Sequence, residues 1–150
     1  MSLLVAAIDQ GVKRLVVEGY PLGESHSLIP GVLDLSYRQN TGAAFSLFHH
    51  APTAALIAVN ILVLGFFLAL VYPHLRTRSG SAAAVLVLGG ALGNLLDRVR
   101  WHYVVDYIDF RVWPVFNIAD MCIVAGVGLL VLVMIRAEWK RPPSPGSEHA

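Results

Sequence analysis

The chain has 150 residues, 56% of which are hydrophobic and only 14% charged, and its formal net charge is +1. A soluble domain of this length has a more polar composition, so the sequence indicates an integral membrane protein. The small net charge gives no support for nucleic-acid binding. The single cysteine, Cys122, excludes an intramolecular disulfide and a cysteine-rich metal site.

The first candidate membrane span covers residues 2–17 and contains the charged residues Asp9, Lys13 and Arg14. Asp9 and Lys13 are four positions apart, so they share one face of a helix and can neutralise each other inside a membrane. We therefore predict a membrane helix with a polar pair. The segment lacks the basic start and the small-residue cleavage site of a secretory signal peptide, so we do not expect it to be cleaved.

Residues 33–38, LDLSYR, follow this run and alternate between apolar and polar side chains. A period of two predicts a half-buried strand, and the turn sequence Asn40-Thr41-Gly42 comes directly after it.

Three further runs are close to the length of about 20 residues that a membrane-spanning helix needs. They cover residues 52–72, 79–96 and 118–135. The first of them begins at Pro52 and ends before Pro73, which suits the two ends of a helix. Counting Lys and Arg on the two sides does not settle the orientation of the spans.

Polar residues gather where the third and fourth spans meet the segment that joins them. Asn94 and Arg98 share a face near the end of the third span, and Asn117 and Asp120 share a face of the opening turn of the fourth. Asp106 lies between them. Residues 97–116 also contain Val104-Val105 and several aromatic residues, which would form a short strand or lie along the membrane interface. The pattern predicts that these polar groups converge at one water–lipid boundary.

The residues alone leave structural explanations open. Asp97 could cap a helix end together with Arg98, and Asp106 and Asp109 could be solvated loop charges. We favour these structural roles for Asp97 and Asp109. Asn94 could simply donate a hydrogen bond between helices. Carboxyl groups at a membrane boundary are uncommon and are usually functional, so Asp106 and Asp120 are candidates for chemistry.

Other functions have weaker support. The chain lacks the serine-hydrolase, zinc-peptidase and phosphate-loop motifs. His49 and His50 are adjacent, so they point in different directions, and solvated histidines are the favoured interpretation. A transporter or channel could use Asp106 and Asp120 to relay protons or bind cations. A scaffold protein could use close helix packing at Gly89 and Gly93.

Five motifs carry a resemblance to a known family: AIDQGVK at 7–13, NTGAAFSLF at 40–48, GGALGNLLDR at 89–98, VVDYI at 104–108 and VFNIAD at 115–120. With these motifs, which occur in the same order as in the family, the chain resembles lipoprotein signal peptidase (signal peptidase II), a family of bacterial membrane aspartic peptidases. The resemblance covers nearly the whole chain apart from the C-terminal tail.

The resemblance implies an all-α membrane protein with four transmembrane helices and a small extracytoplasmic β-sheet. It also implies an interfacial segment, which is a helix in the family. The peptidase domain would cover residues 1–141, and residues 142–150 would be a disordered cytoplasmic tail. Both termini would be cytoplasmic. The protein would lie in the bacterial inner membrane, with its active site near the extracytoplasmic face.

The resemblance also implies the activity, which is cleavage of a prolipoprotein just before its lipid-modified cysteine. Asp106 and Asp120 would be the catalytic pair, and Asp9 and Lys13 a structural pair. The positions expected to line the substrate site are Asn40, Asn94, Arg98 and Asn117. We expect no metal or organic cofactor, a monomeric protein, and membrane lipids and the lipidated substrate as its partners.

Overall fold

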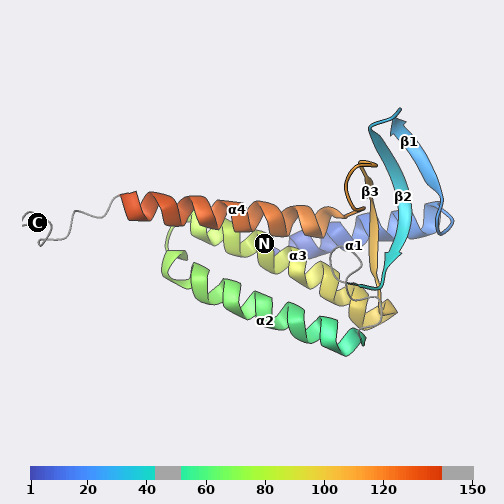
Figure 1. Ribbon diagram of the computed structural model, residues 1–150. Coiled ribbons are helices and arrows are strands. Elements are labelled where there is room, and N and C mark those ends of the chain that lie inside the picture. The colour runs from blue at the N-terminus through green and yellow to red at the C-terminus, as the bar shows by residue number, and fades with distance from the viewer. Residues whose placement is uncertain (43–51, 140–150) are drawn as a thin grey trace, which may run out of the picture.

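The computed structural model describes residues 1–42 and 52–139. Within these residues the chain forms four α-helices, a short 3-10 helix and a three-stranded sheet (Figure 1). The helical elements are α1 (Ser2–Gly19), α2 (Thr53–Val71), η2 (Tyr72–His74), α3 (Arg78–Trp101) and α4 (Ile118–Trp139). The strands are β1 (Ser25–Ile29), β2 (Leu33–Asn40) and β3 (Val104–Asp109). His49, His50 and the predicted tail at 142–150 lie outside the described residues.

Three helical segments in the described part of the chain are long and apolar enough to cross a membrane, namely Thr53–His74, Arg78–Trp101 and Ile118–Trp139. They coincide with the apolar runs predicted at 52–72, 79–96 and 118–135. α2 and α4 leave large apolar side chains such as Leu62, Phe66 and Leu132 exposed. A helix that is apolar on all sides suits a hydrocarbon environment.

α1 covers the predicted first run but is not one of these three segments. Its beginning lies level with the middle of α3, because a Cβ atom on Gly89 would lie 2.5 Å from the Cβ of Val5 and 2.9 Å from the carbonyl oxygen of Ser2. The described residues therefore show a mostly helical protein with three membrane-length helices. The fourth crossing stays a prediction.

α3 is the central helix and packs against α1, α2 and α4 (Figure 1). Small residues allow the close approach. Gly90 faces the carbonyl oxygen of Ala119 in α4, and a Cβ atom on Gly93 would lie 2.5 Å from the carboxylate of Asp9 in α1. An apolar core from α2, α3 and α4 holds the bundle together: Phe67, Val71, Ala83, Ala84, Val87 and Leu130.

The antiparallel sheet has the order β1-β2-β3 and stands at one end of the helix bundle (Figure 1). Asn40 at the end of β2 pairs with Val104 at the start of β3. A second core joins the sheet to α1 and consists of Val16, Tyr37, Val105 and Tyr107. The sheet therefore fixes β3 beside the ends of α1 and α3.

The predicted strand at 33–38 and the strand alternative at Val104-Val105 are confirmed, whereas β1 was not predicted. The buried side chains of β2 do not all lie on one apolar face. Asp34 is 7% exposed and Leu35 is only half-buried. Asp34 accepts hydrogen bonds from Arg111 Nε at 2.8 Å and Nη2 at 3.0 Å, so its charge is compensated. No α-helix besides α1–α4 occurs in the described residues, so the interfacial helix is not identified there.

Candidate active site

Two aspartates from different elements face one cavity at the sheet end of the bundle. Asp106 lies in β3 and is only 3% exposed, whereas Asp120 lies in the first turn of α4 and is half-buried. The cavity has a volume of about 300 Å³. Its polar lining includes Asn40, Asn94, Arg98, Asp106 and Asp120. The fold therefore brings together polar residues that the sequence places on four separate segments.

Asn117 precedes α4 and binds both aspartates. Its side-chain Nδ2 donates to Asp106 Oδ1 at 2.7 Å. Its backbone N–H donates to Asp120 Oδ2 at 3.2 Å, and its Oδ1 accepts from the Asp120 N–H at 3.0 Å. This reciprocal pair is a capping box, in which the first residues of a helix satisfy each other's free N–H groups. The start of α4 thus fixes Asp120 relative to Asp106.

Two further amides hold the carboxyl groups from the other side. Asn40 Nδ2 donates to Asp106 Oδ2 at 2.9 Å, and Asn94 Nδ2 donates to Asp120 Oδ1 at 2.8 Å. These donors are neutral, so they orient the carboxyl groups without neutralising their charge.

The electrostatic environment raises the pKa of Asp106 to about 7. The largest cause is burial, followed by the nearby Asp120 carboxyl group, while the amides of Asn40 and Asn117 act in the opposite direction. Asp106 therefore holds its proton into the neutral range. Two adjacent carboxyl groups, one of which is still protonated near pH 7, can supply both an acid and a base.

Arg98 extends from α3 into the same cavity. Its Nη1 lies 3.4 Å from the carbonyl oxygen of Asn94 in the same helix. Its Nε is buried and has no hydrogen-bond partner among the described residues. A buried donor without a partner is unfavourable, so the guanidinium is available to a polar group of a bound molecule.

Lys13 pairs with Asp9 as predicted, with 2.8 Å between Lys13 Nζ and Asp9 Oδ2. The favoured cap role for Asp97 is wrong. Asp97 is fully buried, and its Oδ2 lies 2.8 Å from the same Lys13 Nζ. Its Oδ1 accepts from Gln10 Nε2 at 2.7 Å. We call Asp9, Lys13 and Asp97 the buried triad.

Sequence reasoning missed Gln10 and the role of Asp97 because their partners lie far away along the chain. One signal was available in the sequence: the predicted membrane segments contain the positive charge of Lys13, and the negative charge of Asp97 could have balanced it. Asp109 is not the loop residue that we expected: it is the last residue of β3, is half-buried, and accepts from the Arg111 N–H at 2.7 Å in an exposed hydrogen bond.

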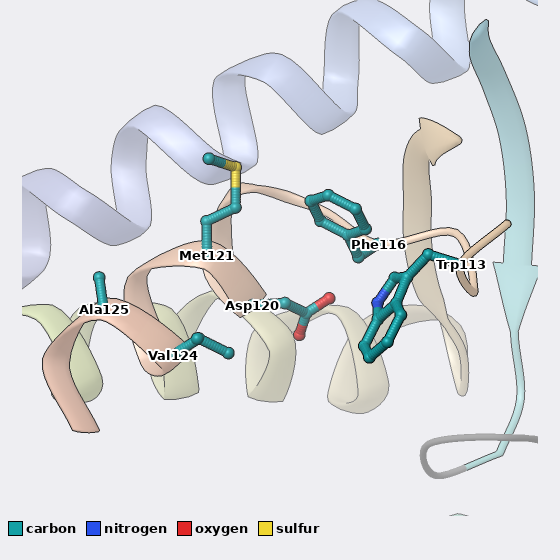
Figure 2. A pocket seen from close by; sticks show the side chains of 6 residues that line it. All are labelled: Trp113, Phe116, Asp120, Met121, Val124 and Ala125. Atoms are coloured by element: carbon teal, nitrogen blue, oxygen red, sulfur yellow. The ribbon is translucent and has the colours of Figure 1, made fainter. Parts of the chain in front are cut away.

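An apolar recess adjoins the polar cavity and has a volume of about 460 Å³. Figure 2 shows Asp120 between Trp113 and apolar side chains of α4, including Val124. Trp113 lines both spaces, although the sequence indicated only an interfacial aromatic residue.

In residues 1–42 and 52–139, no three His, Cys, Asp or Glu side chains are grouped so that they could hold a metal ion. The expectation that the reaction needs no metal or cofactor stays a prediction.

Three membrane-length helices, with one aspartate from α4 and one from β3 in a single cavity at the end of the bundle, define a membrane protein with a candidate acid–base pair. The family model described as Signal peptidase (SPase) II matches residues 1–136. The chain belongs to the signal peptidase II family, a family of membrane aspartic peptidases, which favours an enzyme over the transporter and scaffold alternatives.

Individual relatives agree with this assignment. A lipoprotein signal peptidase from Halothermothrix orenii is 43% identical over 136 residues, which are 91% of this chain and 93% of that protein. One from Moorella thermoacetica is 42% identical, with 95% and 97% of the two chains covered. A solved bacterial membrane enzyme matches with a TM-score of 0.82 and 28% identity, over 95% of this chain and 90% of that one.

Proposed function

We propose that this chain removes the signal peptide from diacylglyceryl-modified prolipoproteins by cleaving the peptide bond just before the lipidated cysteine, with Asp106 and Asp120 as the catalytic pair. The observation that carries the proposal is the position of both aspartates in one cavity, in a chain of the signal peptidase II family. The relatives from Halothermothrix orenii and Moorella thermoacetica are named lipoprotein signal peptidases.

In the proposed reaction, the ionised aspartate accepts a proton from a water molecule, and this water attacks the carbonyl carbon of the scissile bond. The protonated aspartate polarises the carbonyl oxygen and later helps to protonate the leaving amine. The raised pKa of Asp106 supports a pair that holds one proton at neutral pH. The roles of acid and base belong to the pair as a unit.

The surrounding polar residues receive two proposed roles. Asn40, Asn94 and Asn117 orient the two carboxyl groups through the hydrogen bonds described above. Arg98 would donate a hydrogen bond from its unpartnered Nε to the peptide substrate. The acyl chains of the substrate can stay in hydrocarbon because the cavity lies where apolar helices meet the sheet.

We also propose that the chain is monomeric in the bacterial inner membrane, with a peptidase domain at 1–141, a disordered tail at 142–150 and both termini on the cytoplasmic side. α1 would insert as the fourth transmembrane helix, and the active site would lie near the extracytoplasmic face. The position of the sheet and of the cavity at one end of three membrane-length helices (Figure 1) supports an active site at a membrane boundary.

The catalytic pair is tested by Asp106→Asn and Asp120→Asn in purified protein. Each substitution should reduce turnover of a diacylglyceryl prolipoprotein peptide by about 10³-fold or more, because one member of the acid–base pair is lost. Asp109→Asn is the control, since Asp109 binds only a neighbouring exposed backbone N–H in the described hydrogen bonds. Activity within about 10-fold of wild type in either catalytic variant would contradict the assigned pair.

A further inference from the structure

The buried triad lies next to the catalytic pair and joins α1, which carries Asp9 and Lys13, to α3, which carries Asp97. All three of its side chains are fully buried. Lys13 Nζ lies 2.8 Å from Asp9 Oδ2, 2.8 Å from Asp97 Oδ2 and 2.9 Å from Asn94 Oδ1. An ammonium group has three protons to donate, so these contacts use all of them.

Each carboxylate of the triad also accepts the backbone N–H of the residue just before a catalytic aspartate. Asp9 Oδ1 accepts from the N–H of Ala119, which precedes Asp120, at 3.0 Å. Asp97 Oδ2 accepts from the N–H of Val105, which precedes Asp106, at 3.1 Å. The ammonium group of Lys13 holds the two carboxylates together and so ties β3 to the start of α4.

A third connection runs through Asn94. Its Oδ1 accepts from Lys13 Nζ, so its amide group must turn Nδ2 toward Asp120, to which it donates at 2.8 Å. Lys13 therefore fixes the orientation of a side chain that binds the catalytic pair directly.

We propose that the buried triad is a positioning device that sets the separation between Asp106 and Asp120. The inference rests on the proposed function of these two aspartates and assigns to Asp9, Lys13 and Asp97 a role beyond holding the helices together. A displacement of about 1 Å in a catalytic group can lower a rate by about 10²-fold. A triad with defined hydrogen bonds to both backbones restricts such displacement.

The separation between the Asp106 and Asp120 carboxyl groups also affects the pKa of Asp106, which can be measured independently of activity. Asp106 is influenced by Asp120 from α4, Lys13 from α1, Arg98 from α3 and the amide of Asn40 from β2. If β3 moves away from α4, repulsion between the two carboxyl groups decreases. The pKa of Asp106 then falls toward the ordinary value for an aspartate.

The test compares Asp97→Ala with Asp97→Asn in the full-length protein in detergent. Both substitutions remove the charge of Asp97, but only asparagine keeps an oxygen that can accept from the Val105 N–H. The alanine variant should lose about 10-fold or more in kcat with little change in KM, and the asparagine variant should recover most of this loss. Asp109→Asn should leave both constants unchanged.

The second readout is an infrared titration of the protonated Asp106 carboxyl group, identified by its absence in Asp106→Asn. This group should lose its proton at lower pH in Asp97→Ala than in Asp97→Asn. Equal kcat values and equal titrations in the two Asp97 variants would overturn the proposal.

Gly93→Ala tests the same device without changing any charge and provides an answer if Asp97→Ala does not fold. The new methyl group would lie 2.5 Å from Asp9 Oδ2, so the carboxylate of Asp9 must shift. We expect a reduced kcat and an Asp106 titration at lower pH, and an unchanged titration in the folded variant would overturn the proposal. If wild type and Asp120→Asn cleave equally well, the proposed function fails instead.

Discussion

Asp106 links the chemistry of the site to the stability of the fold. Its pKa in the folded protein is about 7, whereas an aspartate in an unfolded chain titrates near pH 4. Between these two values the folded state binds more protons than the unfolded state, so stability decreases as the pH rises. The contribution of the protonated group is complete below about pH 4 and is lost as the pH passes through about 7.

We therefore expect Asp106→Asn, which cannot titrate, to gain stability relative to wild type as the pH rises from about 4 to about 7. The relative gain is on the order of a few kcal/mol, since each unit of pKa difference corresponds to about 1.4 kcal/mol. Thermal unfolding of both proteins in detergent across this range measures it. If the two unfolding temperatures change in parallel with pH, the pKa of Asp106 is not raised.

Arg98 provides a second test at the level of single residues, which concerns substrate binding. Arg98→Ala should lower kcat/KM by about 10- to 100-fold, equivalent to about 1.4–2.8 kcal/mol, as expected for a lost charged hydrogen bond. Arg100→Ala on the same helix is the matched control, because Arg100 is exposed and does not line the cavity. Equal kinetics in the two variants would show that Arg98 does not bind substrate.

Single residues also show what could be predicted from the sequence. Spacing on one helical face placed Asn94 with Arg98, and Asn117 with Asp120, because local geometry decides which side chains share a face. Asp97 was misassigned because its partner, Lys13, belongs to a different helix. The alternation at 33–38 predicted a half-buried strand but not the burial of Asp34, which a bidentate contact with Arg111 allows.

At the scale of the element, the close contact between α3 and α4 depends on Gly90. A Cβ atom there would collide with the backbone carbonyl oxygen of Ala119, just before Asp120. Gly90→Ala should therefore separate the helices and destabilise the protein by about 1–3 kcal/mol, as overpacking does. Thermal unfolding in detergent measures the loss.

Gly128→Ala is the control for this prediction, because a Cβ atom on Gly128 would meet nothing within 4 Å. Alanine favours a helix over glycine by roughly 0.5–1 kcal/mol, so this variant should be at least as stable as wild type. A fully stable Gly90→Ala protein would show that the two helices can move apart freely.

Most elements could be predicted because hydropathy and period are local properties of the sequence. The three long apolar runs became α2, α3 and α4, and the alternating segment became β2. β1 was missed because all five of its residues are exposed, so its sequence lacks an alternating apolar face. Its place in the sheet comes from pairing with β2, which is a tertiary property.

At the scale of the whole molecule, the proposed orientation can be tested by thiol labelling in a Cys122→Ser background. Ser25→Cys in β1 should react with a membrane-impermeant maleimide added outside spheroplasts, because the sheet is proposed to be extracytoplasmic. Arg76→Cys, in the exposed connection between α2 and α3, should react only after permeabilisation. The reverse pattern would contradict the orientation.

The central claim is that the two aspartates cleave a lipidated substrate at the membrane surface. The most direct test uses purified wild-type protein with a synthetic diacylglyceryl prolipoprotein peptide, its unlipidated twin and the Asp120→Asn variant, with the products identified by mass spectrometry. We predict cleavage just before the lipidated cysteine, with no cleavage of the twin and none by the variant. Failure of folded wild-type protein to cleave the lipidated peptide, or equal cleavage by Asp120→Asn, would contradict it.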